Sequence, residues 1–362
     1  MKVLLLSGEE SGEIYARRLR ALMPAAEIRG YADYGFKLAD LAVMGFLAVI
    51  KKLPYFLRVR RTMERAIDQW RPDVVLSVDY PGMNLRLAAY AKRRGIKTVH
   101  LVCPQVWAWK RSRVPRIEAA LDHLCCFFPF EPQYFKAGFA EFVGHPLAED
   151  FPKREIGDFE RGLVALLPGS RIGEIERNLP VMVEAVRRLD GVRALIPAAN
   201  ARALAAIERV LAGISGGADA GRQSSVAIEV CRGGARELLL RAEMAVVASG
   251  TATLEAALAR CPTVLVYKVD AFLAWFARRV IKDIRHIGIV NIIWEKTGGR
   301  GEEPMVELLQ EAFTAEAVSS VLRKWRDNPD LRERAAARLG EVAAQLFGDG
   351  QSLQRVVKMV LQ

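Results

Sequence analysis

The sequence has no hydrophobic run long enough to cross a bilayer, and it has few cysteines. A membrane-spanning helix needs about 18–20 consecutive apolar residues, and the chain of 362 residues contains no such run. Its five cysteines show no paired metal-ligand spacing and stand mostly in apolar stretches, which indicates buried free thiols rather than disulfides or a zinc site. The chain starts on a strand pattern instead of a secretory leader, so we expect a cytoplasmic protein.

Common nucleotide-binding signatures are also missing. The sequence contains no Gly-x-Gly-x-x-Gly and no Walker motif, which excludes the commonest dinucleotide and nucleoside triphosphate loops. Asp-x-Asp, with which many sugar-nucleotide enzymes hold a metal-bridged diphosphate, does not occur either. A diphosphate bound by this chain would have to be neutralised by arginine and helix N-termini, and we expect no metal cofactor.

The composition bounds the number of domains and the kind of partner. Apolar residues make up 51% of the chain, charged residues 26%, and the formal net charge is +11. A chain of this length exceeds what one hydrophobic core usually supports, which predicts two domains. The positive charge predicts an anionic partner, such as nucleic acid, a phosphorylated metabolite or an acidic membrane surface.

Apolar strands alternate with amphipathic helices on both sides of a polar, linker-like stretch, Glu149–Arg161. This alternation predicts an α/β protein with two doubly wound, mostly parallel sheets. The strands expected in the first sheet are Val3–Leu6, Val74–Val78, Thr98–Val102, His123–Phe128 and Glu141–Val143. Those expected in the second are Leu163–Leu167, Val192–Pro197, Val226–Val230, Met244–Ala248 and Thr263–Tyr267.

Five loops follow these strands directly. Ligands of open parallel sheets bind at the carboxyl ends of the strands, so we expect an active site in a cleft between the two domains. The loops are Gly8–Gly12, Asp79–Asn84, Pro104–Trp109, Pro168–Arg171 and Ser249–Glu255.

The first loop, SGEESGE (7–13), has the outline of a phosphate loop, with glycines between a strand and a helix. Three carboxylates (Glu9, Glu10 and Glu13) would repel a phosphate, so another ligand is indicated.

The loops of the second half have the opposite chemistry. PGSR (168–171) places Arg171 at a helix entrance, and SGTATLE (249–255) offers hydroxyls at another. Glu255 lies one turn further on, where its carboxylate can accept hydrogen bonds from a sugar diol. Together the loops predict a nucleotide-diphosphate site, although an ordinary turn with an exposed arginine and a capped helix would give the same strings.

Two loops of the first half admit alternatives. Asp79 in VDYPGMN (78–84) follows an apolar strand, as a general base would, but a carboxylate that only caps the next helix fits equally. PQVWAWKRSRV (104–114) combines two tryptophans with cations. Stacking on nucleic acid is one use of that combination, and packing against the neighbouring domain is the commoner one.

Two further stretches, MGFLAVIKKLPYFLRVRR (44–61) and AFLAWFARRVIKDIR (271–285), mix large apolar residues with Lys and Arg. They match segments that lie on an anionic lipid surface, although amphipathic core helices with basic outer faces would look alike. The basic residues are Lys51, Lys52, Arg58, Arg60 and Arg61, with Arg278, Arg279 and Lys282.

Taken together, the motifs resemble one family, the lipid-A-disaccharide synthases, over nearly the whole chain. The matching strings are SGEESGE (7–13), LAVMGF (41–46), PQVWAWKRSRV (104–114), FPFEPQYF (128–135), FVGHPL (142–147), LLPGSR with EI (174–175), SGTATLE (249–255) and YK (267–268). The chain departs from the family pattern in several places. The glycine-rich segment before LAVMG is missing, Ala48 stands where an acid is usual, Glu13 replaces an aspartate, and IVN (289–291) replaces LPN.

The resemblance implies a glycosyltransferase-B-type fold of two Rossmann-like domains, with a C-terminal segment packing back on the first. It places the domains at residues 1–148 (with about 342–362) and 160–340. It implies transfer of 2,3-diacylglucosamine from UDP-2,3-diacylglucosamine to 2,3-diacylglucosamine 1-phosphate (lipid X), without a metal. It further implies a cytoplasmic enzyme on the anionic inner-membrane surface that can form a homodimer and binds no nucleic acid.

The resemblance also implies residue roles. Asp79 is the catalytic base. The acceptor and transfer side holds Glu9, Ser11, Gly12, Glu13, Asn84 and Gln105. The UDP-sugar side holds Gly169, Ser170, Arg171, Ser249, Gly250, Thr251, Thr253, Glu255 and Asn291. The competing functions are a UDP-sugar epimerase of the same fold, which needs no membrane-facing segments, and a basic nucleic-acid-binding protein.

Overall fold

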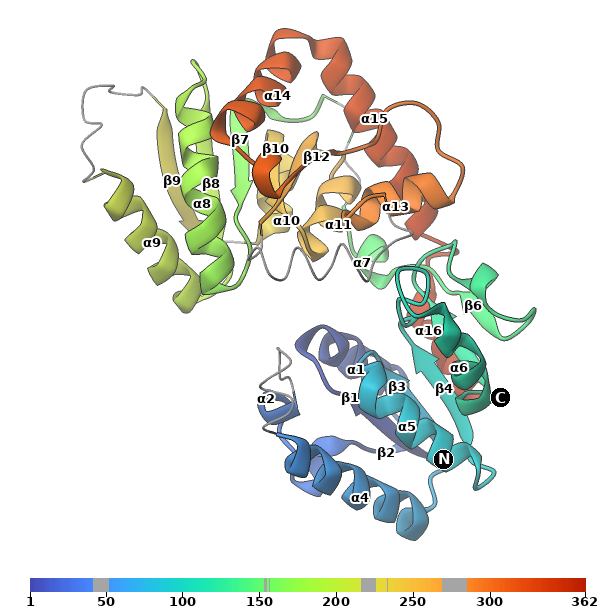
Figure 1. The fold of residues 1–362 in the computed structure, drawn as a ribbon. Coiled ribbons are helices and arrows are strands. Elements are labelled where there is room, and N and C mark those ends of the chain that lie inside the picture. Colours follow the sequence, from blue (N-terminus) through green and yellow to red (C-terminus); the bar gives the residue numbers. More distant parts are fainter. Residues whose placement is uncertain (42–51, 153–154, 156, 216–225, 233, 269–284) are drawn as a thin grey trace. The chain divides into compact units, whose positions relative to one another are not determined.

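The computed structural model describes residues 1–41, 52–152, 155, 157–215, 226–232, 234–268 and 285–362 (Figure 1). The chain divides into two compact units. Unit 1 contains Met1–Glu149 and Leu346–Gln362, and unit 2 contains Asp150–Gln345.

Unit 1 is built on a sheet of six strands in the order β2-β1-β3-β4-β5-β6. Every neighbouring pair is parallel, as expected from the alternation of strands and helices. The strands are β1 (Lys2–Ser7), β2 (Glu27–Arg29), β3 (Val74–Val78), β4 (Lys97–Leu101), β5 (His123–Cys126) and β6 (Ala140–Phe142).

Helices cover both faces of this sheet because its strands are apolar on both sides. Val3 and Leu5 pack in one cluster with α1 and α16, whereas Leu4 and Leu6 pack in another with α4 and α5. The helices are α1 (Glu10–Leu22), α2 (Leu38–Leu41), α4 (Leu53–Trp70), α5 (Pro81–Lys92), α6 (Val114–Ala120), α7 (Pro146–Glu149) and α16 (Ser352–Leu361). Short 3₁₀ turns lie at Tyr31–Tyr34, Arg111–Arg113 and Pro132–Tyr134.

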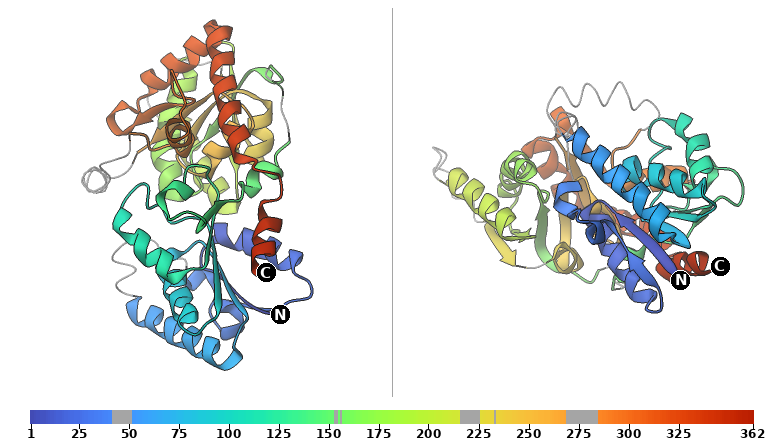
Figure 2. Two further views of the ribbon diagram at one scale, coloured as in Figure 1. Left: turned by 90° about the vertical axis from the view of Figure 1, so that its right-hand side faces the viewer. Right: turned by 90° about the horizontal axis from the view of Figure 1, so that it is seen from below.

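The C-terminal helix α16 packs back on unit 1, which confirms the expectation from the family resemblance (Figure 2). Its Leu353, Val356 and Val360 are at most 1% exposed and share a cluster with the first strands. The returning chain passes so close to Gly144 that a Cβ there would lie 2.9 Å from the Phe347 carbonyl oxygen. Gly144 also has φ +87°, so this crossing requires a glycine.

Unit 2 repeats the architecture with a parallel sheet in the order β12-β11-β10-β7-β8-β9. Its strands are β7 (Glu160–Leu167), β8 (Arg193–Ala198), β9 (Ala227–Arg232), β10 (Ala242–Ala248), β11 (Thr263–Tyr267) and β12 (Val306–Leu309). Its helices are α8 (Ile172–Arg187), α9 (Ala201–Ser215), α10 (Ala235–Arg241), α11 (Thr251–Leu258), α13 (Ile289–Lys296), α14 (Ala315–Asp327) and α15 (Pro329–Leu346), with a 3₁₀ turn at Gln310–Ala312.

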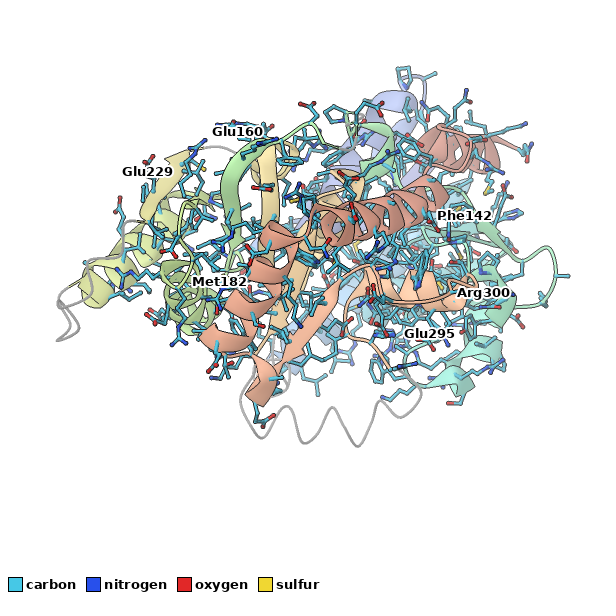
Figure 3. The ribbon with its side chains drawn as sticks, turned by 90° about the horizontal axis from the view of Figure 1, so that it is seen from above. Phe142, Glu160, Met182, Glu229, Glu295 and Arg300 are labelled. Carbon is cyan, nitrogen blue, oxygen red and sulfur yellow. The ribbon has the colours of Figure 1, made fainter. Side chains whose placement is uncertain are left out.

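One face of the second sheet is covered by α8, α9 and α14, with Met182 of α8 fully buried in their common cluster (Figure 3). At the amino end of the sheet, Glu160 forms ion pairs with Arg193 and with Arg241, whose Nε lies 2.5 Å away. These side chains are 40–53% exposed, so the pairs add little stability. One carboxylate is thus shared by two guanidinium groups at this edge.

All ten strands expected from the sequence are present, most with ends displaced by one or two residues. Two short edge strands, β2 and β12, were not expected. β2 has only three residues and none of them is buried, while β12 carries no residue that is fully buried. β2 reads EIR and β12 reads VELL, so charged residues leave neither strand a continuous apolar run.

Candidate functional site

In unit 1 the chain reverses its direction of travel across the sheet between β1 and β3. β1 leads through α1 to β2 on one side, and β3 leads through α5 to β4 on the other. Ligands of doubly wound sheets bind where such a reversal separates two loops. Because Ser7 pairs with Val78, SGEESGE and Asp79 emerge side by side at this point.

Asp79 and Tyr80 both adopt left-handed backbone conformations, with φ +49° and +51°. Such conformations are costly for residues with a Cβ and concentrate at functional sites. Two glycines make room for them. A Cβ on Gly8 would lie 2.3 Å from the Tyr80 ring, and one on Gly12 would lie 3.2 Å from the Val78 carbonyl oxygen. The glycines of SGEESGE therefore serve close packing against the Asp79 turn rather than an anion.

The strained turn is held from inside by Asn84, which is fully buried. Its Nδ2 donates to the carbonyl oxygens of Asp79 at 2.7 Å and of Leu6 and Val78 at 3.3 Å each. Its Oδ1 accepts from the Tyr31 hydroxyl at 2.8 Å. We expected Asn84 on the acceptor side, but its amide is occupied within the core. It supports Asp79 from behind, together with Tyr31, to which no sequence pattern pointed.

Asp79 is itself half-buried, and burial raises the pKa of its carboxyl group above the ordinary value of 3.8. The Tyr80 N–H, which donates to Oδ1 at 2.8 Å, opposes that rise. Tyr80 rather than Asp79 occupies the N-cap position of α5, and no side-chain cap is formed there. This geometry favours the general-base interpretation of Asp79 over the helix-capping one.

The carboxylates of SGEESGE do not all face solvent. Glu13 accepts a short hydrogen bond from the Ser7 hydroxyl and lies 3.8 Å from Arg17, so its position is set by its own loop. Glu9 and Ser11 are exposed at the start of α1, where Glu9 occupies the N-cap position. Ser7, which the sequence analysis did not single out, is thus the residue that orients Glu13.

Gln105 is exposed in a loop whose other members are mostly buried. Trp107, only 8% exposed, lies edge-on against Phe130 at 5.4 Å between ring centroids. The expectation that both tryptophans pack against the other domain is wrong for Trp107, which packs inside its own unit. Trp109 is 37% exposed, with the Lys110 ammonium 4.5 Å from its ring.

In unit 2 the corresponding reversal lies between β7 and β10. Leu167 pairs with Val247, so PGSR and SGT, which follow these strands, emerge next to each other. Two loops about 80 residues apart in the sequence are thereby brought to the carboxyl edge of one sheet.

Each of these loops leads into a helix whose N-terminus has no side-chain capping hydrogen bond; the N-cap residue is Arg171 for α8 and Gly250 for α11. Gly250 has φ +155°, a conformation that L side chains rarely adopt, and a Cβ there would meet nothing within 4 Å. Ser249 is half-buried and Thr251 exposed, whereas the buried Thr253 donates to the Gly250 carbonyl at 2.7 Å. The arrangement offers backbone N–H groups and hydroxyls to an anion.

Arg171 is 61% exposed and donates to Glu174 at 2.8 Å. Glu174 also covers Gly169, since a Cβ there would lie 2.5 Å from its Oε2. The guanidinium expected to meet a phosphate is therefore oriented by a carboxylate of the same helix. Ser170 beside it is exposed.

Two asparagines of unit 2 are structural. Asn291, expected on the UDP-sugar side, is 1% exposed, and its Nδ2 donates to Met305 and Glu307, both at 2.9 Å. Asn178, which the sequence analysis did not single out, is 3% exposed and donates to the Pro168 carbonyl at 2.9 Å. The only feature of the sequence that could have pointed to Asn178 is that it is a polar residue among the apolar positions of α8. Asn178 steadies the PGSR loop as Asn84 steadies Asp79.

Glu255 is half-buried on α11, and burial raises the pKa of its carboxyl group, an effect that Arg236 opposes. A carboxyl group in that environment is suited to hydrogen bonding with hydroxyls.

Within the described residues, one cluster of unit 1 brings three potential metal-ligand atoms within 4.8 Å of one another, namely those of Cys103, Cys126 and Glu131. Both oxygens of Glu131 already accept hydrogen bonds, and the Cys103 thiol donates to the Pro104 carbonyl at 3.3 Å. The hydrogen-bonding needs of this buried carboxyl group are thus met within the protein.

Comparison with known proteins points to one family. The family model described as lipid-A-disaccharide synthetase matches residues 3–338. The lipid-A-disaccharide synthase of Neisseria gonorrhoeae is 36% identical over 351 residues, which cover 89% of this chain and 86% of that protein. The enzyme of the same name from Coxiella burnetii is 32% identical, covering 99% of this chain and 97% of that protein.

Solved structures share the fold at low sequence identity. A UDP-GlcNAc 2-epimerase from Neisseria meningitidis bound to UDP-GlcNAc superposes with a TM-score of 0.58 at 10% identity, covering 100% of both chains. A glycosyltransferase from Rickettsia africae superposes with a TM-score of 0.57 at 12% identity, covering 99% of this chain and 97% of that one. At such identities the likeness establishes two Rossmann-like domains of glycosyltransferase-B type and nothing about the reaction.

Substituting Asn84 by alanine should destabilise unit 1 by about 2–4 kcal/mol, because buried carbonyls and the Tyr31 hydroxyl lose their partner. Tyr31→Phe removes only one hydrogen bond of the same cluster and should cost about 1 kcal/mol. Chemical denaturation measures both. Equal losses for the two variants would contradict the central role of the Asn84 amide.

Proposed function

The chain belongs to the lipid-A-disaccharide synthase family. From that premise we propose that the loops at the reversal point of unit 1 activate the acceptor of a glycosyl transfer, and that those of unit 2 bind the UDP-sugar donor. The enzyme is a glycosyltransferase of lipid A disaccharide synthesis. It transfers 2,3-diacylglucosamine from UDP-2,3-diacylglucosamine to 2,3-diacylglucosamine 1-phosphate and releases UDP. The proposal rests on one observation: in each unit, two candidate loops emerge side by side at the reversal point of the sheet.

We assign UDP to unit 2. A diphosphate suits the exposed Arg171 and the N-termini of α8 and α11, and the half-buried Glu255 suits sugar hydroxyls. No metal is needed in this assignment, because the cation and the helix dipoles supply the positive charge. Accordingly, EDTA should leave the transfer rate unchanged.

Arg171→Ala should weaken UDP binding by ~30–150-fold, which corresponds to the loss of about 2–3 kcal/mol of charge-assisted hydrogen bonding. The fold should be unaffected, because the side chain is largely exposed and its one ion pair is local. Isothermal titration calorimetry with UDP measures the effect. Arg209→Ala is the matched control, since it removes another exposed, glutamate-paired arginine of unit 2. Equal UDP affinity in both variants would refute the placement.

We assign to Asp79 the role of the general base that activates the acceptor. The acceptor's 6-hydroxyl is a poor nucleophile until its proton is removed as the new bond forms. The Asp79 carboxylate takes that proton while UDP leaves from the opposite face of the sugar, so the product is β-linked. Burial raises the pKa of Asp79, which makes its carboxylate a stronger base.

Asp79→Asn should lower turnover by at least ~10²-fold, because the side chain keeps its size and its bond to the Tyr80 N–H but loses basicity. UDP affinity and melting temperature should stay near those of the unchanged chain. In the unchanged chain the rate should fall at acid pH through a midpoint above 3.8, because burial raises that pKa. A near-normal rate for Asp79→Asn would pass the role to Glu9, Glu10 or Glu13. A large loss of stability would favour the capping role.

A product assay separates the transferase from the alternatives. Incubation with both diacylated substrates should give the disaccharide 1-phosphate and UDP. An epimerase would instead convert a UDP-sugar in the absence of the acceptor. A nucleic-acid-binding protein would retain oligonucleotides and form no disaccharide.

We further propose that α4 lies on the anionic surface of the inner membrane, where the acylated substrates are embedded. Leu53 and Leu57 are 52% and 42% exposed on this helix, next to the exposed Arg58 and Arg61. Arg60 pairs with Glu64 at 2.8 Å and so contributes less. Residues 44–51 of this stretch, with Lys51, and residues 271–284 of the second stretch, with Arg278, Arg279 and Lys282, lie outside the described residues. Of the described helices, none has both the length and the apolar character to cross a bilayer.

Replacing Lys51, Lys52, Arg58, Arg60 and Arg61 by glutamine should release the protein from anionic vesicles. Each cation near the surface contributes about 1 kcal/mol, and salt should weaken binding of the unchanged chain. Vesicle flotation measures the bound fraction. The control replaces five exposed basic residues of unit 2: Arg188, Arg202, Arg209, Arg323 and Lys324. Equal release by both sets would argue for net charge alone. We also propose that the chain forms the homodimer that the family resemblance implies, and light scattering tests this separately.

A further inference from the structure

One buried carboxyl group of unit 1 has no part in the transfer as described so far. Glu131 is 2% exposed and follows β5 in the loop that continues from Cys126. Burying a carboxyl group is unfavourable unless its oxygens are hydrogen-bonded, so its partners indicate what it does.

Glu131 connects the loops that follow two neighbouring strands. Its Oε1 accepts from the Trp107 indole Nε1 at 3.2 Å, and its Oε2 accepts from the Phe128 backbone N–H at 3.1 Å. Trp107 lies beyond β4, and Phe128 lies beyond β5. Both oxygens thus act as acceptors, one for each loop.

Trp107 in turn anchors the loop that carries Gln105. Val106, Trp107 and Ala108 are at most 8% exposed, whereas Gln105 is exposed. The Gln105 carbonyl accepts from the N–H groups of Ala108 at 3.2 Å and Trp109 at 3.3 Å. Trp107 is therefore part of the same short turn as Gln105. A movement of its indole would move Gln105 as well.

We propose that Glu131 is a positioning residue of the transfer reaction, which holds Trp107 and through it the loop that presents Gln105 at the carboxyl edge of the first sheet. This inference rests on the proposed function, in which that edge binds the acceptor. In its ionised form the side chain accepts at both oxygens. A glutamine of the same shape has one acceptor and one donor group, so it would leave either the indole or the Phe128 N–H facing an NH₂ group.

The charge of Glu131 changes near neutral pH. Burial raises the pKa of Glu131 to about 8, and the hydrogen bonds from Phe128 and Trp107 oppose that rise. The titratable groups that face it from the two strands are the thiols of Cys103 and Cys126. Because a carboxylate accepts hydrogen bonds more strongly than the neutral acid, the hold on Trp107 should tighten as pH rises through about 8.

The kinetic test uses Glu131→Gln in the full-length chain, assayed with both diacylated substrates above pH 8, where Glu131 is ionised. The value of kcat/KM for the acceptor should fall by at least ~10-fold, because small displacements of a positioning group are costly to the rate. UDP affinity should stay within about twofold of normal, since UDP is assigned to unit 2.

A double-mutant cycle isolates the contact between the two side chains. Trp107→Phe removes the indole N–H and keeps a ring against Phe130. In the double variant the glutamine can turn its oxygen to the Phe128 N–H and its NH₂ toward the phenyl ring. Its loss of kcat/KM should therefore be smaller than the product of the two single losses.

A spectroscopic measurement needs no substrate. The six tryptophans give indole ¹H–¹⁵N signals, and the signal missing from Trp107→Phe belongs to Trp107. That signal should shift with pH through a midpoint of about 8 in the unchanged chain and should lose this shift in Glu131→Gln.

The control is Thr98→Val, which removes buried hydrogen bonds at the opposite end of β4. If it lowers kcat/KM as much as Glu131→Gln, general destabilisation explains the effect and the proposal fails. Normal kinetics in Glu131→Gln would also overturn it. An unchanged chain that forms no disaccharide while its Trp107 signal titrates would reject the proposed function, and with it the role in transfer, but would leave the Glu131–Trp107 contact intact.

Discussion

Parallel strand pairing is the constraint on which the rest of each unit depends. Every described strand pair is parallel, so each connection must cross back over a sheet face and all carboxyl ends collect at one edge. Where the direction of winding reverses, two neighbouring loops part and leave backbone N–H groups uncovered. The apolar character of the strands, which serves folding, thereby also decides where polar chemistry is located.

At the carboxyl edges of both sheets the candidate functional groups depend on buried polar ones. Asp79 keeps a strained backbone because the buried Asn84 amide donates hydrogen bonds to three carbonyl oxygens around the turn, including that of Asp79 itself. Asn178 holds the Pro168 carbonyl in unit 2, and Glu131 holds the Trp107 loop. Buried groups of this kind are costly when unpaired, so each one restricts its loop to a single arrangement. In each loop a hydrogen-bonded residue in the core thus helps to orient a more accessible residue at the edge.

The two edges differ in charge in a way that suits two substrates. Unit 1 presents Asp79 and Glu9, whereas unit 2 presents Arg171 beside two uncapped helix N-termini. Carboxylates hold hydroxyls and accept protons, and a guanidinium with helix dipoles holds phosphate. The similar architecture of the two units thus supports opposite electrostatic roles, which matches a reaction between a sugar acceptor and a sugar nucleotide.

The sequence by itself determined the α/β class, ten of the strands and the loops that follow them, because most of these strands are buried, largely apolar runs and a glycine or proline often follows the end of such a run. It could not reveal β2 and β12, which lack such runs. Only the tertiary structure decided which loops are neighbours and which polar residues face inward. Asn84 and Asn291 were predicted as site residues and are core residues in the fold, because the partners of a buried amide include carbonyl groups far away in the chain. The roles of Asn178, Glu131 and Tyr31 could not be predicted for the same reason. Their hydrogen bonds join residues that are 10, 24 and 53 positions apart, respectively, and such bonds leave no local sequence pattern.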